Sequence, residues 1–371
     1  MVFTFGTVFS YGIFRDPFSA TFGASPLALS VAFSIMLFTF FVGSGVVGIF
    51  GVRFPARAVL LTCGLLTALA APSLYLVDSV WTLTIVLSAY GLALGTYFVL
   101  VASIVPRWFE RRRGAATGLI FVGNGLGLFL LPPIWQTALA EVGVRRGFLF
   151  VVGANAVAFL LAGLVCRRPG WVEQTSATTG DLLDWLSRLG RTPQFQLLFV
   201  GIALTFGWYQ LFAAYAVDLF SARGMAPGAA SAAFGAVGGV SIASRIGSGY
   251  VSDRVGVRRS FLASLGVTSS GLLLVLVPAR PVLFVGIFLV GIGLGATATL
   301  YVPLLMGIYA SEMDSAVVGV FNVGIGVAAL VMPPLGTASA AFFEGYAISV
   351  GVTVTMSVLA IATVARATAG E

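Results

Sequence analysis

Long apolar runs separated by short polar connectors dominate this chain. Twelve runs are long enough for a membrane-spanning helix, near residues 3–21, 29–51, 58–77, 80–105, 115–135, 147–165, 195–219, 229–251, 260–278, 281–304, 316–336 and 341–365. About 20 apolar residues in a helix cross a hydrocarbon core of about 30 Å. The pattern predicts an all-α integral membrane protein with twelve transmembrane helices. The opening run lacks a basic flank and a cleavage site, so we expect a retained first helix rather than a signal peptide.

The longest connector is dense in polar residues and divides the runs into two sets of six. We expect an N-terminal six-helix bundle at 1–166, a cytoplasmic linker at 167–194 and a C-terminal six-helix bundle at 195–371. Within the linker, one helical face would carry Leu182, Trp185, Leu186 and Leu189. Such an amphipathic segment is expected to lie on the cytoplasmic membrane surface, with a disordered tether as the alternative.

Glycines and prolines repeat between the two halves at an offset near 201 residues. The matched positions are Gly23, Pro26, Gly118, Gly123, Gly125, Pro132 and Pro133 with Gly224, Pro227, Gly319, Gly324, Gly326, Pro333 and Pro334, and, with one residue of slippage, Gly91 and Gly95 with Gly291 and Gly295. Because six spans separate the copies, both copies have the same topology, as in transporters built from parallel repeats. We expect the glycines to let helices approach closely.

Composition limits the chemistry that is available. Of 371 residues, 59% are hydrophobic and 9% are charged, which excludes a water-soluble fold. There is no histidine, and all 20 basic residues are arginine, so imidazole bases, histidine metal sites, Schiff bases and a Walker lysine are excluded. Cys63 and Cys166 lie in or beside apolar runs and are interpreted as small apolar fillers. We predict no enzyme activity, no metal site and no cofactor.

The arginines gather in the short connectors, which is typical of membrane orientation and not of a nucleic-acid-binding surface. If both termini are cytoplasmic, fourteen arginines lie inside and five outside, with Arg245 left within a span. This asymmetry predicts a multi-pass protein of the cell membrane with both termini in the cytoplasm and no nucleic-acid partner.

A polar motif in the second half resembles the major facilitator superfamily. That family has approximately Gly-x-x-x-Asp-Arg-x-Gly-x-Arg between the second and third spans of each half. This chain has Gly249-Tyr250-Val251-Ser252-Asp253-Arg254-Val255-Gly256-Val257-Arg258-Arg259 there, and the first half has Val52-Arg53-Phe54-Pro55-Ala56-Arg57, without the acid and the glycine. The resemblance implies the major facilitator fold of two six-helix bundles. It also implies a cytoplasmic latch, in which a carboxylate caps a helix end and pairs with arginine, formed by Asp253, Arg254, Arg258, Arg53 and Arg57.

Two other stretches resemble the monocarboxylate transporter and oxalate/formate antiporter branch of that superfamily. They are Tyr11-Gly12-Ile13-Phe14-Arg15-Asp16 with Phe22-Gly23-Ala24-Ser25, and Arg107-Trp108-Phe109-Glu110-Arg111-Arg112-Arg113-Gly114-Ala115-Ala116-Thr117-Gly118. The branch places an anion-binding arginine in the eighth span, where this chain has Arg245. This chain departs from the branch at three positions. It has Ser241 where proton-coupled members have an acid, and Phe9 and Asn322 where members have lysine. No central carboxylate is left to carry a coupling proton.

Arg245 is the one ionisable residue that lies away from the ends of the spans. A charge near the bilayer centre costs about 2.5–3.5 kcal/mol, so it normally faces a wet cavity on a solute path. Snorkelling, or a structural pair with backbone carbonyls, is the alternative. One guanidinium neutralises one carboxylate, so a monoanion fits better than a dianion.

Other polar side chains in the spans are candidates for contacts with a substrate. Each has an interhelical hydrogen bond or an interfacial ring as its alternative role. They are Tyr11, Tyr90, Tyr97, Asn124, Tyr209, Gln210, Tyr301 and Asn322.

Together these features predict a secondary active or facilitative transporter that moves small, monocarboxylate-like organic monoanions by alternating access. We expect its partners to be the anion and the lipid bilayer, and we expect it to act as a monomer. An exporter of neutral or amphipathic small molecules, with Arg245 in a structural role, is the alternative within the same class. A transporter-like membrane receptor is the alternative from another class.

Overall fold

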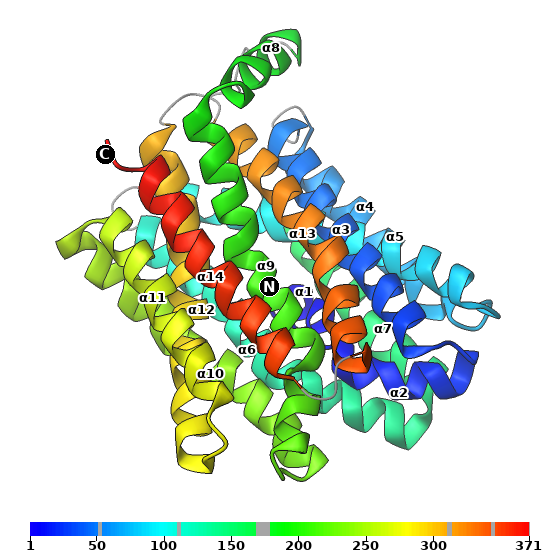
Figure 1. The fold of residues 1–371 in the computed structure, drawn as a ribbon. Coiled ribbons are helices and arrows are strands. Elements are labelled where there is room, and N and C mark those ends of the chain that lie inside the picture. The colour runs from blue at the N-terminus through cyan, green and yellow to red at the C-terminus, as the bar shows by residue number, and fades with distance from the viewer. Residues whose placement is uncertain (51–53, 110–112, 168–178, 310–313, 343–345, 371) are drawn as a thin grey trace.

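The computed structural model describes residues 1–50, 54–109, 113–167, 179–309, 314–342 and 346–370, and every regular element in these ranges is a helix. Figure 1 shows the arrangement. The helices are α1 (Val2–Val8), α2 (Tyr11–Phe22), α3 (Pro26–Phe50), α4 (Ala56–Ser73), α5 (Val80–Ile104), the short 3₁₀ helix η2 (Val105–Trp108), α6 (Arg113–Val142), α7 (Val144–Val165), α8 (Thr179–Gly190), α9 (Pro193–Ala222), α10 (Pro227–Val255), α11 (Val257–Leu276), α12 (Arg280–Ile308), α13 (Asp314–Phe342) and α14 (Ala347–Ala367).

Eleven helices in the described ranges are long and apolar enough to cross a membrane. The remaining span, expected as one helix over 3–21, is broken into α1 and α2. At the break, the Ser10 hydroxyl donates a hydrogen bond to the Gly6 carbonyl, and the Ser10 amide turns back to the Thr7 carbonyl. Serine bonded to the preceding turn bends helices, so this local competition explains the interruption.

The helix boundaries repeat between the halves and confirm the expected two six-helix bundles. The second to fifth spans of the first half begin at residues 26, 56, 80 and 113, and their counterparts begin at 227, 257, 280 and 314. Gly23 and Gly224 both have positive φ angles, 63° and 82°, and each stands three residues before the proline that begins the next helix. Glycine adopts this left-handed conformation without a steric penalty, so the same turn is built twice. The exact domain boundaries stay a prediction.

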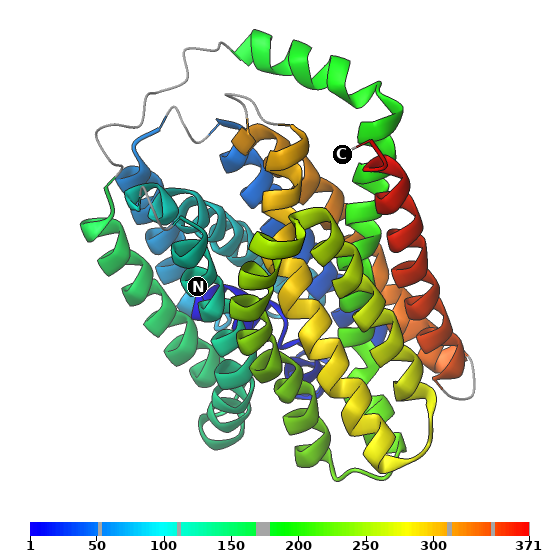
Figure 2. The ribbon, with the colours of Figure 1, turned by 90° about the vertical axis from the view of Figure 1, so that its left-hand side faces the viewer.

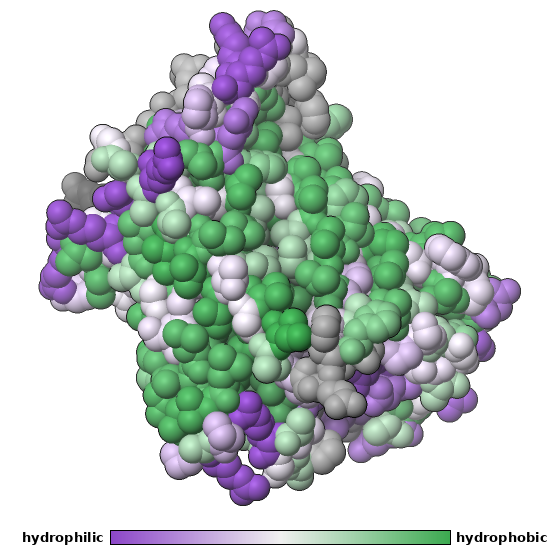
Figure 3. Space-filling view, in the orientation of Figure 1, coloured by the Kyte–Doolittle hydropathy of each residue, from purple (hydrophilic) through white to green (hydrophobic). Residues whose placement is uncertain are grey.

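Apolar side chains cover the middle of the molecule and polar ones gather at its two ends (Figure 3). Large apolar side chains face outward along the spans, for example Leu119, which is 74% exposed. Since lipid is the matching environment, the protein is a multi-pass membrane protein.

The linker contains the expected amphipathic helix, α8, while its residues 168–178 lie outside the described ranges. In Figure 2 α8 lies across the top of the molecule, at the same end as the C-terminus. Trp185, Leu186 and Leu189 are half-buried, whereas Asp184 and Arg188 are exposed. We call this end of the protein the α8 end.

The two bundles meet along two helix pairs, α3 with α13 and α6 with α10. Glycines at equivalent positions make both contacts close. A Cβ placed on Gly125 would lie 2.6 Å from Cγ1 of Ile242, and one on Gly326 would lie 2.9 Å from Cβ of Phe41. The glycines therefore let the backbone of one half pack directly against side chains of the other half, as expected. Gly118 differs from that expectation, because a Cβ there would meet nothing within 4 Å.

Candidate functional site

Arg245 lies on α10, at its contact with α6 of the other bundle. Ser241, one turn earlier on α10, lies against Gly125 of α6. Arg245 stands ten residues before the end of α10, which at 1.5 Å per residue is about 15 Å from the α8 end and near mid-membrane. The eighth span thus brings Arg245, the charged residue in its middle part, to the interface between the halves.

The guanidinium of Arg245 is enclosed by protein and makes no hydrogen bond to the described part of the chain. The residue is 1% exposed, and none of its three side-chain nitrogens has a hydrogen-bond partner in the described part of the chain. This burial excludes snorkelling to the membrane surface in this conformation, and the missing bonds exclude a pair with described backbone carbonyls. A buried charge without a partner is costly, so the site is electrostatically incomplete as it stands.

One aromatic ring lies near the guanidinium, and a tyrosine on a second helix interacts with its charge. The ring centroid of Phe121, on α6, lies 6.0 Å from Cζ of Arg245, at the outer limit of a cation–π contact. The Tyr209 phenol, on α9, interacts electrostatically with the same guanidinium. Sequence reasoning missed Phe121, although it precedes Gly125 by one turn on the helix face that meets α10.

Asn124 and Gln210 are further unpartnered polar groups in the centre of the protein. Asn124 is 0% and Gln210 is 2% exposed, and both amide atoms of each lack a hydrogen-bond partner in the described ranges. On α6, Gly123 faces α1 and Gly125 faces α10. Asn124 therefore points between α1 and α10, on the side of α6 where Arg245 lies. Its amide could donate to, or accept from, a bound solute.

The structure does not bring the other candidate residues to Arg245 through any described contact. Tyr301 donates to the Asn322 side-chain oxygen over 3.4 Å, and Asn322 donates to Ser44 of α3 over 2.8 Å. Tyr97 stacks on Phe159, with ring centroids 3.7 Å apart, and Tyr90 accepts from Asn155 over 2.7 Å. The side chain of Tyr11 lies outside the described part of the chain. The hydrogen bonds of Tyr90, Tyr301 and Asn322 match the interhelical alternative, whereas Tyr97 makes a ring contact.

No hydrogen bond or ion pair joins the described residues of the expected latch to one another. Asp253 is exposed, and no contact of its carboxylate is found among the described residues. Arg254 bonds to the Tyr250 hydroxyl and stacks over its ring, and Arg258 donates to the Thr368 hydroxyl over 2.8 Å, within the same bundle. Arg57 is exposed, and Arg53 lies outside the described ranges.

Comparisons with known proteins agree with this architecture. The family model described as Major Facilitator Superfamily matches residues 1–251 and 197–369. An oxalate:formate antiporter from Oxalobacter formigenes is 25% identical over 279 residues, covering 71% of this chain and 63% of that protein. Monocarboxylate transporter 13 of Bos taurus is 27% identical over 278 residues, covering 74% of this chain and 64% of that protein.

A third relative, the MFS-type transporter pytF of Aspergillus terreus, is 28% identical over 270 residues, covering 68% of this chain and 86% of that protein. The matches thus span somewhat under two thirds of the length of the antiporter and of the bovine transporter. Because the family model covers nearly all of the chain and the helix order repeats as that family requires, the protein belongs to the Major Facilitator Superfamily.

Proposed function

We propose that this transporter moves small organic monoanions with one carboxylate group, which binds Arg245 between the two bundles. The single observation that carries the proposal is the guanidinium that is 1% exposed and lacks any hydrogen-bond partner in the described chain. A carboxylate would complete this site with two parallel, charge-assisted hydrogen bonds. In a water-poor cavity such a contact is much stronger than in bulk water.

Charge balance favours a monoanion. No lysine or histidine occurs anywhere in the chain to assist Arg245, so a second carboxylate on the substrate would stay uncompensated. Asn124 and Tyr209 would supply hydrogen bonds to the rest of the solute. The name of the bovine relative refers to monocarboxylates, which supports this substrate class, while the name of the antiporter refers to formate and to the dicarboxylate oxalate and supports a small carboxylate in general.

The arginine asymmetry supports an orientation with the α8 end, and both chain termini, on the cytoplasmic side of the cell membrane. In this orientation Arg15 and Asp218 lie at the outer end. A cysteine introduced at Gly224 tests this orientation. It should react with an impermeant thiol reagent added from outside the cell.

Counterflow of labelled lactate, pyruvate, formate and oxalate in proteoliposomes tests the substrate class. We expect uptake of a monocarboxylate that falls at least tenfold in Arg245→Gln. Arg245→Lys should lose less, because it keeps the charge but not the planar fork. Arg146→Gln is the matched control, since Arg146 is an exposed arginine at the start of α7.

Unchanged monocarboxylate counterflow in purified, folded Arg245→Gln would overturn the anion site. Transport of neutral or amphipathic compounds by that variant would then favour the exporter, a function named for another fungal relative, the fujikurins efflux protein of Gibberella fujikuroi.

A further inference from the structure

Gln210, in the middle of α9, is a buried amide that the proposed anion site does not use. It is 2% exposed, and neither its side-chain oxygen nor its side-chain nitrogen has a hydrogen-bond partner in the described part of the chain. Two other glutamines of α9 do have partners: Gln194 donates to the Ala367 carbonyl over 3.1 Å, and Gln196 donates to the Gly190 carbonyl over 3.0 Å. A buried amide without a partner costs free energy, so Gln210 has hydrogen-bonding capacity that the described residues do not satisfy.

The neighbours of Gln210 on α9 show where its side chain points. Tyr209 lies against Phe234 of α10, with ring centroids 6.5 Å apart, and Leu211 lies against Gly336 of α13. Successive residues turn by about 100° around a helix, so Gln210 lies on the face of α9 between these two contacts.

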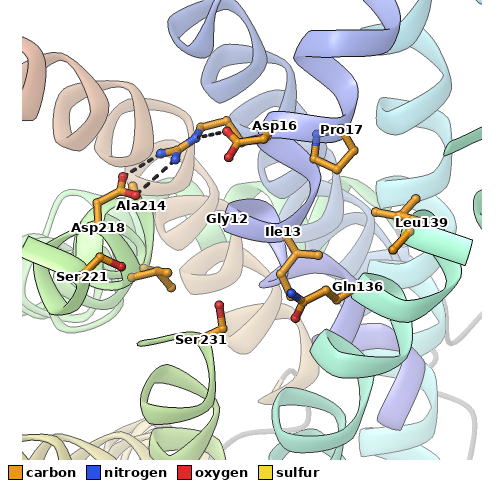
Figure 4. Close-up of a pocket in the computed structure, with 14 residues that line it drawn as sticks. Gly12, Ile13, Asp16, Pro17, Gln136, Leu139, Ala214, Asp218, Ser221 and Ser231 are labelled. Carbon is orange, nitrogen blue, oxygen red and sulfur yellow. Dashed lines mark hydrogen bonds and ion pairs between the residues drawn. The ribbon is translucent and has the colours of Figure 1, made fainter. Parts of the chain in front are cut away.

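The same face of α9 lines a cavity of about 440 Å³ between the two bundles, at the end opposite α8 (Figure 4). The cavity walls come from α2 and α6 of one half and from α9 and α10 of the other. Gln210 precedes the lining residues Ala213, Ala214 and Val217 by three, four and seven positions, which is the spacing of one helix face. Because α9 runs away from α8 along the chain, Gln210 lies one turn inward of this lining, toward the membrane centre.

The unpaired donor and the unpaired acceptor of Gln210 limit the group that would complete it. A hydroxyl both donates and accepts, whereas an ammonium only donates and an ionised carboxylate only accepts. A second carboxylate on the solute is also disfavoured in the cavity itself. Arg15 at its rim already donates to Asp218 over 2.6 and 3.1 Å and to Asp16 over 3.0 Å (Figure 4), and these two carboxylates would repel a further anion.

The hydroxyl must be remote from the carboxylate that Arg245 would bind. The charge of Arg245 interacts with Tyr209, while Gln210 makes no hydrogen bond to Arg245. On a helix about 10–12 Å wide, the ends of adjacent side chains lie about 8 Å apart. At about 1.5 Å per C–C bond, a hydroxyl at the far end of an acid of about five carbons can span this separation, and one on the carbon next to the carboxylate cannot.

We propose that Gln210 selects among the anions that Arg245 binds, by hydrogen-bonding a hydroxyl group at the end of the carbon chain opposite the carboxylate. The preferred substrates are then monocarboxylates with a terminal hydroxyl, over unsubstituted acids and over acids hydroxylated next to the carboxylate. This role of Gln210 rests on the proposed function, because it requires a carboxylate at Arg245.

Stabilisation of the purified protein against heat by added ligand tests the selectivity. The probes are three acids of equal chain length: pentanoate, 2-hydroxypentanoate and 5-hydroxypentanoate. We expect the parental protein to bind 5-hydroxypentanoate about tenfold more tightly than the other two, because that acid alone completes the buried amide. In Gln210→Leu this preference should fall below about twofold, while the affinity for pentanoate changes by less than about twofold.

Gln196→Leu is the matched control, since it makes the same substitution on the same helix at an exposed glutamine. It should keep the full preference. Gln210→Asn retains the amide on a shorter side chain and should keep part of the preference. Without ligand, Gln210→Leu should melt at or above the parental temperature, because the substitution removes an unpaired buried amide.

Four results would each overturn the role of Gln210. They are a parental protein that binds 5-hydroxypentanoate no more tightly than pentanoate, one that binds none of the three acids, a Gln210→Leu protein that keeps the preference, and a Gln210→Leu protein that is unfolded or melts below Gln196→Leu without ligand. The last result would show that Gln210 has a structural partner. A failed anion site gives a different result, namely parental affinity for all three acids in Arg245→Gln.

Discussion

Arg245 combines deep burial with an absence of hydrogen-bond partners among the described residues, and the proposed anion site accounts for both properties. An arginine that snorkels keeps its guanidinium in water, and a structural arginine donates its hydrogen bonds to carbonyl oxygens. Arg258 illustrates the second case, because it donates to the Ala365 carbonyl over 3.3 Å and to the Thr368 hydroxyl over 2.8 Å. Arg245 has neither contact with water nor a hydrogen bond to a carbonyl in the described chain, so a bound anion is the simplest way to balance its charge.

Gly125 and Gly118 lie on the same helix but differ in surroundings. A Cβ on Gly125 would come within 2.6 Å of Ile242 and 3.2 Å of the Gly238 carbonyl oxygen, whereas one on Gly118 would meet nothing within 4 Å. Gly125→Ala is therefore expected to destabilise this conformation by about 1–3 kcal/mol through overpacking at the bundle interface. Gly118→Ala should be neutral or slightly stabilising.

Thermal unfolding of the purified variants in detergent checks this difference. A Gly125→Ala protein as stable as its Gly118→Ala counterpart would show that α6 and α10 are not in close contact at this point.

At the scale of elements, most of the fold could be predicted from the sequence because spans are long and uniformly apolar. The apolar run near 58–77 corresponds to α4. The offset of 201 residues found for glycines and prolines also separates the first residues of α3 and α10. The break of the first span could not be predicted. The break depends on the hydrogen bond from the Ser10 hydroxyl to the Gly6 carbonyl. The hydrophobic pattern of an apolar run does not predict which carbonyl a serine will bind.

The candidate site was predictable in part for a similar reason. A lone charge in an apolar helix is conspicuous, so Arg245 could be singled out. The partners of Asn322 and Tyr301 could not be, since Ser44 comes from the opposite half and its contact arises only from the packing of α3 on α13.

The hydrogen bond between Ser44 and Asn322 links α3 to α13 across the bundle interface. We expect Ser44→Ala and Asn322→Ala to be coupled by about 0.6 kcal/mol, and by at most about 1.7 kcal/mol, in a double-mutant cycle of unfolding free energy, as for other interhelical bonds in membranes. Ser44→Ala with Asn155→Ala is the control pair, because Asn155 bonds to Tyr90 within one bundle and should show no coupling.

If Asn322→Ala instead left stability unchanged and weakened solute binding, Asn322 would belong to the substrate site rather than to the interface.

At the scale of the whole molecule, the two ends of the bundle interface differ. The end opposite α8 is joined by the Arg15–Asp218 pair, while at the α8 end the motif residues bind only within their own bundle in the described ranges. An alternating-access transporter exchanges such end states, and a contact present in one state biases the equilibrium by its own free energy. Asp253 is exposed here, as expected for a carboxylate that meets its partner only when the α8 end closes.

Asp253→Asn should therefore slow exchange about threefold or more while changing solute affinity less than twofold. Its carboxylate touches nothing described in this conformation, so the substitution should leave this state unaffected and destabilise only the state in which the carboxylate is paired. Exchange rates and equilibrium binding measured on the same proteoliposomes separate the two effects. Asp184→Asn, an exposed aspartate on α8 at the same end, is the control for loss of surface charge. If Asp253→Asn exchanged at the rate of that control, the motif would mark topology without acting as a latch.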